Sequence, residues 1–266
     1  SNAQGEYYLT DIIAMAVDHG LSVTVSQPLN PFEVQGVNNR LQLAELERWY
    51  QRQQAERLMT EGASLADPAR IEVRGELIIG NDLWIDVNAV FEGRVSLGNN
   101  VVIGPNCVIK DATIADGAEI KANSVIEGAV VGANAQIGPF ARLRPGTELA
   151  ANTKVGNFVE TKKAVVGEGS KINHLSYVGD ASLGRNVNVG AGTITCNYDG
   201  VNKHQTVLGD GVFVGSNTSL VAPVNVAEQA TIGAGSTITR DISEGELAVA
   251  RGKQRNIAGW ERPKKA

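Results

Sequence analysis

Residues 214–237 read V-G-S-N-T-S, L-V-A-P-V-N, V-A-E-Q-A-T and I-G-A-G-S-T, a run of six-residue units that each open on an aliphatic residue. The same phase returns through residues 79–238, with occasional five-residue steps and one longer gap after Thr195. Nearly all phased positions are Ile, Leu or Val, and the exceptions are Phe91, Thr161 and Thr195. A period of six fits neither an α-helix nor an alternating strand, and it is typical of a parallel β-helix.

Three units make one triangular coil in which each aliphatic side chain points inward, and the number of units predicts about nine coils. Successive coils should stack at strand spacing, roughly 4.8 Å apart. Gly, Asn or Asp often follows the aliphatic residue, as at Gly215 and Gly233, and these types tolerate the positive φ of tight corners. Each buried aliphatic side chain contributes roughly 1.5–3 kcal/mol, so the column is a sufficient core. The spacing does not set the handedness of the coil.

Composition narrows the class of protein. The 266 residues are 42% hydrophobic and 20% charged, as in a globular protein of one or two domains. No apolar run is long enough to span a bilayer and no signal-peptide pattern is present, so we expect no membrane partner. A formal charge of −5 argues against a nucleic-acid partner. Cys107 and Cys196 are expected to be reduced and structural, which suits the cytoplasm.

The chain divides into three expected segments. Residues 1–37 carry no hexads. A helix is predicted from Thr10 or the next residue, and a strand is predicted at residues 21–25. This segment is interpreted as the tail of another domain. Residues 38–66 are predicted to form a connecting helix with one apolar face. Residues 67–266 are predicted to form the hexapeptide-repeat domain with a C-terminal tail.

Two cations share one place in the repeat. Arg144 follows Leu143 and Lys162 follows Thr161, with three unbroken hexads between them. We expect their side chains to stack at the same corner in adjacent coils, where a phosphate is the usual partner of two close cations. The alternative is a pair of solvated surface charges.

His174 and Tyr177 lie off the inward column, so the imidazole is expected at the surface or in a cleft, free to titrate. One coil later the position equivalent to His174 is Ala191, which leaves room beside the ring. The alternative is an ordinary surface histidine. The aliphatic phase fails at Thr161 and Thr195, near these polar residues, and such breaks favour a functional site.

A groove is also predicted from the phase. If Val201 is counted as a phased position, Asn197, Ser216 and Ala234 each lie two residues after a phased position. We expect them to line one face in three successive coils, in a groove suited to a thin extended ligand such as a pantetheine arm. Arg251, beyond the last coil, could take a terminal phosphate.

Several motifs resemble one known family. They are H-L-S-Y-V-G-D at 174–180, G-A-G-T-I-T-C-N-Y-D-G at 190–200, F-A-R-L-R-P-G at 140–146, N-F-V-E-T-K-K at 157–163 and G-E-Y-Y-L-T-D at 5–11. On these motifs, in the same order through the whole chain, the protein resembles bacterial N-acetylglucosamine-1-phosphate uridyltransferase/glucosamine-1-phosphate N-acetyltransferases.

The resemblance implies a mainly β fold. It consists of a left-handed parallel β-helix that forms a homotrimer, preceded by a connecting helix and the tail of an α/β nucleotidyltransferase (pyrophosphorylase) domain. The family's L-x-x-G-x-G-T nucleotide loop is absent from the sequence, so uridyltransferase activity, which uses Mg²⁺, is expected to be missing. Asn38 matches the family's metal and UDP-sugar asparagine but lacks its partners.

The resemblance also implies a reaction: His174, as general base, activates the 2-amino group of glucosamine-1-phosphate for attack on acetyl-CoA. The product, N-acetylglucosamine-1-phosphate, supplies UDP-N-acetylglucosamine for peptidoglycan and lipopolysaccharide. The residues implied to hold the sugar phosphate are Arg144, Lys162, Tyr177 and Asn188, together with Lys203 of a neighbouring subunit. Those implied to line the acetyl-CoA site are Ala191, Asn197, Tyr198, Ser216, Ala234 and Arg251.

Three other functions compete with this one. A zinc enzyme resembling the γ-class carbonic anhydrases would need about three convergent histidines, and of the three present His19 lies outside the repeats. A trimeric scaffold would consume no acetyl-CoA. A related hexapeptide-repeat acyltransferase would use an acyl-carrier protein or another amino sugar.

Overall fold

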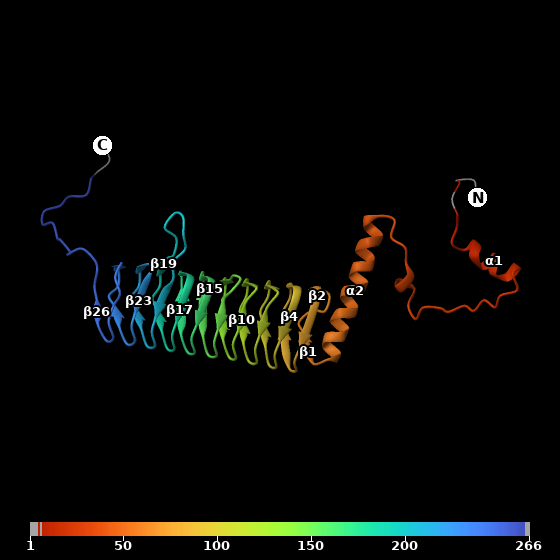
Figure 1. Ribbon diagram of the computed structural model, residues 1–266, viewed down its shortest axis with the longest axis horizontal. Helices are drawn as coiled ribbons and strands as arrows, with labels where there is room; N and C mark the ends of the chain where they lie inside the picture. The colour runs from red at the N-terminus through yellow and green to blue at the C-terminus, as the bar shows by residue number, and fades with distance from the viewer. Residues whose placement is uncertain (1–4, 6, 264–266) are drawn as a thin grey trace. The chain divides into compact units, whose positions relative to one another are not determined.

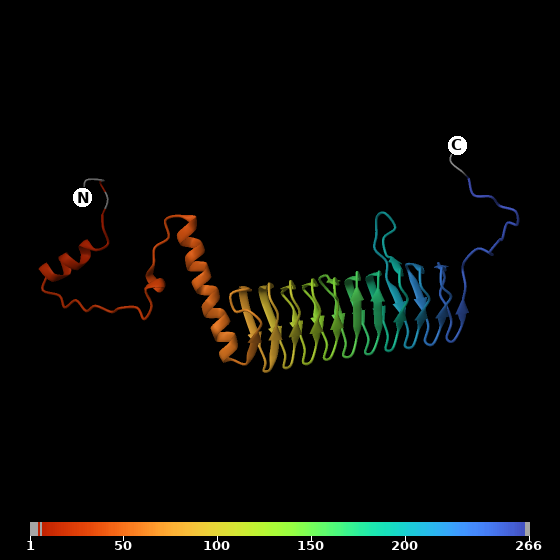
Figure 2. The same cartoon turned by 180° about the vertical axis from the view of Figure 1, so that it is seen from behind.

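The computed structural model describes residue 5 and residues 7–263, which form two units with their boundary between Trp49 and Tyr50. The second unit is a stack of coils made of short parallel strands, shown from two sides in Figures 1 and 2. The hexapeptide period therefore predicts the fold correctly. The structure is a parallel β-helix.

One side of the coils is an eleven-stranded parallel sheet. In spatial order its strands are β1 (Ala63–Leu65), β3 (Leu83–Ile85), β5 (Val102–Ile103), β8 (Glu119–Ile120), β11 (Gln136–Ile137), β14 (Lys154–Asn157), β16 (Lys171–His174), β18 (Asn188–Val189), β21 (Phe213–Val214), β24 (Thr231–Ile232) and β26 (Leu247–Ala248).

The remaining strands form a fifteen-stranded parallel sheet. Its long strands β2, β4, β15 and β17 each pair along their whole length with a strand of a neighbouring coil. The strands are β2 (Ile71–Ile79), β4 (Ala89–Leu97), β6 (Val108–Lys110), β7 (Thr113–Ile114), β9 (Val125–Glu127), β10 (Val130–Val131), β12 (Arg142–Leu143), β13 (Glu148–Leu149), β15 (Glu160–Val166), β17 (Tyr177–Leu183), β19 (Ile194–Cys196), β20 (Thr206–Leu208), β22 (Ser219–Val221), β23 (Val224–Val226) and β25 (Thr237–Ile238).

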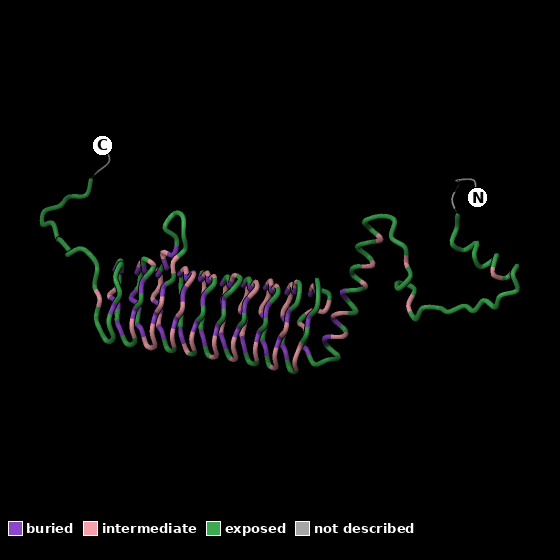
Figure 3. The backbone as a smooth tube through the Cα atoms, in the orientation of Figure 1, coloured by how far each residue is buried: buried purple, intermediate pink, exposed green. Residues whose placement is uncertain are grey.

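The core is the phased column. Register pairs such as Ile85 with Ile103 and Ile172 with Val189 stack phased residues directly on one another. Almost all of the phased aliphatic residues are buried, as are both threonines of the column, whereas Ile79 is partly buried at the first coil. In Figure 3 the buried positions recur in every coil.

The stack is longer than the hexad count predicts. β1 pairs with β3 and β26 pairs with β24, so each end of the sheet carries a strand outside the phased run. The first coil therefore includes residues 63–65, which the sequence placed in the connecting segment. The helix that precedes it ends at Thr60.

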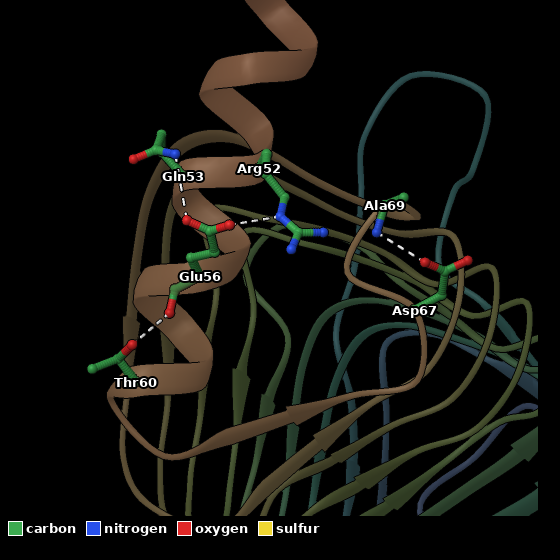
Figure 4. Close-up of polar contacts among 6 residues, drawn as sticks. All are labelled: Arg52, Gln53, Glu56, Thr60, Asp67 and Ala69. Atoms are coloured by element: carbon green, nitrogen blue, oxygen red, sulfur yellow. Dashed lines mark hydrogen bonds and ion pairs between the residues drawn. The ribbon is translucent and has the colours of Figure 1, made fainter. Parts of the chain in front are cut away.

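The connecting helix α2 (Arg40–Thr60) starts close to the predicted place. Its first turn is capped reciprocally: the Asn39 side chain accepts from the Gln42 N–H at 2.9 Å, and the Gln42 side chain accepts from the Asn38 N–H at 2.8 Å. Figure 4 shows its exposed side, where Glu56 accepts from Arg52 Nε at 2.7 Å and from Gln53 at 3.4 Å.

The other face of α2 closes the first coil. Gln51 is buried; it donates to the Val73 carbonyl oxygen at 2.9 Å and accepts from the Val73 N–H at 2.8 Å. Arg57 donates to the Leu77 carbonyl oxygen at 3.1 Å. These side chains satisfy backbone groups of β2, which pairs with β4 on its other edge.

The first unit contains α1 (Asp11–Asp18), with Thr10 at its N-cap position as predicted, and a short 3₁₀ turn, η1 (Pro31–Val34). The strand predicted at residues 21–25 is wrong: the segment has no regular structure, because no neighbouring strand pairs with its backbone and its side chains are exposed. Of the helices in the described residues, none is both long and apolar enough to cross a bilayer.

Candidate functional site

His174 lies at the corner that follows the eleven-stranded sheet. Its register neighbour in the preceding coil is Asn157, and the His174 Nδ1 lies 2.9 Å from the Asn157 Oδ1. The His174 carbonyl oxygen accepts from the hydroxyl of buried Ser176 at 2.8 Å. The ring itself is exposed, and Ala191 occupies the equivalent position in the following coil, as predicted. The imidazole thus has a hydrogen-bond partner on one side and space on the other.

The predicted groove is partly wrong. Val189 pairs with Val214, and Val214 with Ile232, so Ser216 and Ala234 continue the column of His174 and Ala191. The same column does not contain Asn197, which follows a strand of the other sheet, where Thr195 pairs with Leu220. The error came from counting the unphased residues 197–205 as part of the repeat. The column of small residues therefore begins beside His174.

The stacking of Arg144 on Lys162 is confirmed. Leu143 pairs with Thr161, and the Arg144 N–H donates to the Thr161 carbonyl oxygen at 2.9 Å. The outward positions before Arg144 in this column alternate in charge: they are Arg74, Glu92, Lys110 and Glu127. Lys162 ends the alternation, because it places a second cation beside Arg144.

Two further side chains complete this corner. Arg144 forms a 2.8 Å ion pair with Glu160, and both side chains are 34% exposed. Tyr177 is the register neighbour of Glu160, and its ring folds over Gly179, the register neighbour of Lys162. A Cβ at position 179 would collide with the Tyr177 hydroxyl. Only glycine leaves room for the phenol beside Lys162.

Lys203 comes to the same place from the loop between β19 and β20, which projects from the coils beside the β19 label in Figure 1. Tyr198 and Lys203 form an antiparallel bridge at the base of this loop. The nearby ammonium of Lys203 is the main cause that lowers the pKa of Lys162; burial and Arg144 add to this effect, and Asp180 opposes it. Three cations therefore gather here.

The loop is held together by its own polar contacts. Asp199 accepts from the Val201 and Asn202 N–H groups at 2.8 and 2.6 Å and lies 2.7 Å from His204 Nε2. The His204 hydrogen bond, together with those N–H groups, holds the pKa of the Asp199 carboxyl well below its usual range. These contacts fix the backbone from which Lys203 extends.

Of the residues implied to line an acetyl-CoA site, three have contacts that the sequence did not predict. Asn197 is buried and donates to Asp180 at 2.5 Å. The Tyr198 hydroxyl donates to the Gly200 carbonyl oxygen at 2.5 Å. Arg251 donates to the Ala234 carbonyl oxygen at 2.6 Å, so it reaches the end of the small-residue column.

One chain does not bring all the expected residues together. Asn188 faces outward on the eleven-stranded sheet, between Lys171 and Phe213, and not at the corner of Arg144 and Lys162. Asn38 is exposed before α2. The histidines lie on separate elements, and the described residues contain no group of three or more His, Cys, Asp or Glu that could hold a metal. Both cysteines are free; burial raises the pKa of the Cys107 thiol.

Sequence reasoning missed three polar residues at these corners: Asn157, Glu160 and Asp180. Each was detectable from the repeat, because Asn157 stands one coil before His174 in the same column, and Glu160 and Asp180 flank Lys162 and Gly179. The period predicts which residues share a column, but it does not predict which of their side chains bond to one another.

The fold defines a class: this is a left-handed parallel β-helix protein built on hexapeptide repeats. A hexapeptide-repeat model of succinyl-transferases matches residues 205–240, and a GMPPB C-terminal domain model matches residues 73–149. A solved structure with this fold is LpxA, a UDP-N-acetylglucosamine acyltransferase from Bacteroides fragilis (TM-score 0.50, 18% identity), which aligns with 66% of this chain and 68% of its own.

Curated relatives are far more similar. The chain is 99% identical over all of its 266 residues to the bifunctional protein GlmU of Marinobacter nauticus, of which it spans 59%. It is 62% identical to the GlmU of Stutzerimonas stutzeri and 57% identical to that of Pseudoalteromonas atlantica, spanning 59% and 58% of them. The chain is similar along its whole length to bifunctional GlmU proteins but spans only about three fifths of theirs, and the resemblance inferred from its motifs is confirmed.

Proposed function

We propose that this chain transfers the acetyl group of acetyl-CoA to the 2-amino group of glucosamine-1-phosphate. The observation that carries the proposal is the gathering of Arg144, Lys162 and Lys203 at one corner. Glu160 and Asp180 offset part of their charge. The remaining positive charge suits a phosphate monoester, which carries up to two negative charges.

His174 is the proposed general base. With its Nδ1 occupied by Asn157, the Nε2 faces solvent and can take a proton from the amine as the nitrogen attacks the thioester carbonyl carbon. The new C–N bond forms, the C–S bond breaks through a tetrahedral intermediate, and the departing CoA thiolate receives the proton. The thioester carries its own activation, so no metal takes part in this proposed step.

The column of small residues beside His174 is the proposed place for acetyl-CoA. Ala191, Ser216 and Ala234 stand one above another from the histidine towards Arg251. Their short side chains leave a strip along which a pantetheine arm can lie with its thioester next to the imidazole. Arg251 at the far end suits the negative charge of the nucleotide part.

A homotrimer belongs to the same proposal. Asn188 and the Arg144–Lys162 corner lie on different sides of one chain, so a shared site would form where two copies meet. Mixing Asn188→Ala protein with Lys162→Ala protein, after partial unfolding and reassembly, should then restore part of the activity that each lacks alone. Light scattering should give three times the chain mass, and a monomeric active species would contradict this part.

The test of the reaction is release of free CoA thiol with glucosamine-1-phosphate, compared with glucosamine, glucosamine-6-phosphate and UDP-glucosamine. We expect turnover with the 1-phosphate to exceed the others by at least about tenfold, since a lost charge-assisted contact costs about 1.5–3 kcal/mol. Turnover on another amino sugar at the same rate would favour a different acyltransferase, and no thiol release would favour a scaffold. Location in the cytoplasm, where acetyl-CoA is available, completes the proposal.

A further inference from the structure

The column that contains His174 has an unusual pair of polar residues. Its other members are small or apolar: Val87, Pro105, Ala122 and Pro139 precede the pair, and Ala191, Ser216 and Ala234 follow it. Asn157 and His174 occupy consecutive coils between these two groups. An amide at this place is therefore not a feature of the repeat.

Backbone conformation does not account for Asn157 either. Asparagine is common in this fold at the next position, where Asn88, Asn106 and Asn123 have positive φ. In the coil of Asn157 that conformation belongs to Phe158, at φ 56°. Asn157 itself is not a positive-φ residue, so its amide is not required by the turn.

The geometry of the pair is fixed from both sides. Phe158 and Leu175, which follow the two polar residues, both have positive φ, so the chain turns in the same way in the two coils. The Leu175 N–H donates to the Asn157 carbonyl oxygen at 3.1 Å, which locks the two corners in register. The side chains at 157 and 174 therefore leave the backbone side by side, with His174 Nδ1 2.9 Å from Asn157 Oδ1.

We propose, on the basis of the proposed function, that Asn157 is a positioning residue: its Oδ1 accepts the His174 Nδ1–H and keeps Nε2 unprotonated and pointed at the amine. An amide oxygen can only accept, so it selects the Nδ1–H tautomer of the neutral ring. An Nε2–H ring could not accept a proton at the exposed nitrogen. Asn157 thus acts on the reaction only through His174.

The first test reads the tautomer without any reaction. Histidine-selective nitrogen-15 labelling and long-range nitrogen–proton correlation spectra distinguish Nδ1–H from Nε2–H, and His174→Ala identifies the signal among the three histidines. We expect the Nδ1–H form for neutral His174, and a loss of this bias in Asn157→Ala. An Nε2–H form in the parent protein overturns the proposal even if the enzyme acetylates glucosamine-1-phosphate.

The second test uses kinetics with matched variants. Asn157→Ala should lower kcat about three- to tenfold, the equivalent of one hydrogen bond, with KM for both substrates within about twofold. Asn157→Asp still accepts from Nδ1–H, but its carboxylate favours the imidazolium, so the acidic limb of the pH profile should move up by about one pH unit. Asn99→Ala, which removes side-chain contacts between coils to Asn81 and Asp116, should change neither.

The outcomes separate the alternatives. If Asn157→Ala and Asn157→Asp both lose activity in proportion to thermal stability, with no change in tautomer or pH profile, Asn157 is structural and the proposal fails. If the parent shows the Nδ1–H tautomer but releases no thiol with any amino sugar, the positioning stands and the proposed function fails.

Discussion

Gln51→Leu should loosen the first coil of the β-helix. Leucine has a similar size, so the main change is the loss of two hydrogen bonds to Val73, a residue only 2% exposed. Each orphaned backbone group costs about 1–3 kcal/mol, so the local loss is about 2–6 kcal/mol. Because each coil contacts only its neighbours, the loss should stay near β2 and fade along the stack.

Hydrogen exchange measured by mass spectrometry is the suitable assay. Amides of residues 71–79 should exchange at least about thirtyfold faster in Gln51→Leu, the equivalent of 2 kcal/mol, whereas those of residues 213–232 should keep their parent rates. Gln53→Leu is the matched control, because Gln53 lies on the exposed side of α2. Unchanged protection of residues 71–79 would refute the view that the Gln51 side chain holds the backbone of β2 in place.

Three further predictions concern the corners. His174→Ala should lower kcat roughly 10²- to 10⁴-fold in the thiol-release assay, whereas the control His19→Ala, at an exposed histidine, should not lower it. Near-parent turnover in His174→Ala would contradict the assignment of His174 as the general base. Arg144→Ala and Lys162→Ala should each raise KM for glucosamine-1-phosphate more than KM for acetyl-CoA. In the double variant this KM should rise by less than the product of the two single factors, since both cations face one anion. Independent effects would mean that the two side chains bind separate ligands. Lys162→Gln should raise Tm at neutral pH without ligand, because Lys203 disfavours the charged form of Lys162 in the folded state. Because the pKa of Lys162 is lowered in the folded state, the parent protein gains stability as the pH rises toward the ordinary lysine pKa of about 10.4. The Tm difference between Lys162→Gln and the parent should therefore be smaller at pH 10 than at pH 7.

The register of Arg144 and Lys162 was predictable because counting suffices where the repeat is unbroken. Three hexads without a slip connect Arg144 and Lys162, and the structure aligns them. The same counting failed for Asn197, because the loop after β19 contains no inward aliphatic residue to mark the phase. A sequence period predicts which residues stack only where the inward-facing aliphatic residues recur without a gap.

Partners were harder to predict than positions. Asn157 was visible in the sequence as the residue before His174 in the column, but spacing does not say that an amide oxygen will meet a ring nitrogen. Glu160 likewise reaches Arg144 through side-chain torsions that the period leaves open. The wrong strand at residues 21–25 has a related cause, since alternation indicates a strand only when another strand is present to pair with it.

The two threonines that interrupt the aliphatic column support the corners from within. The Thr195 hydroxyl accepts from the Gly179 N–H at 2.8 Å, directly beneath the glycine that Tyr177 covers. Thr161, which precedes Lys162, shares a 3.0 Å hydrogen bond with another buried threonine hydroxyl. A buried hydroxyl is stable only with such partners. Valine at position 195 would therefore leave the Gly179 N–H without its acceptor, and valine at position 161 would leave the buried Thr147 hydroxyl without this partner. Threonine therefore replaces an aliphatic residue at positions 161 and 195 of the column, where its hydroxyl forms hydrogen bonds close to Lys162 and Gly179.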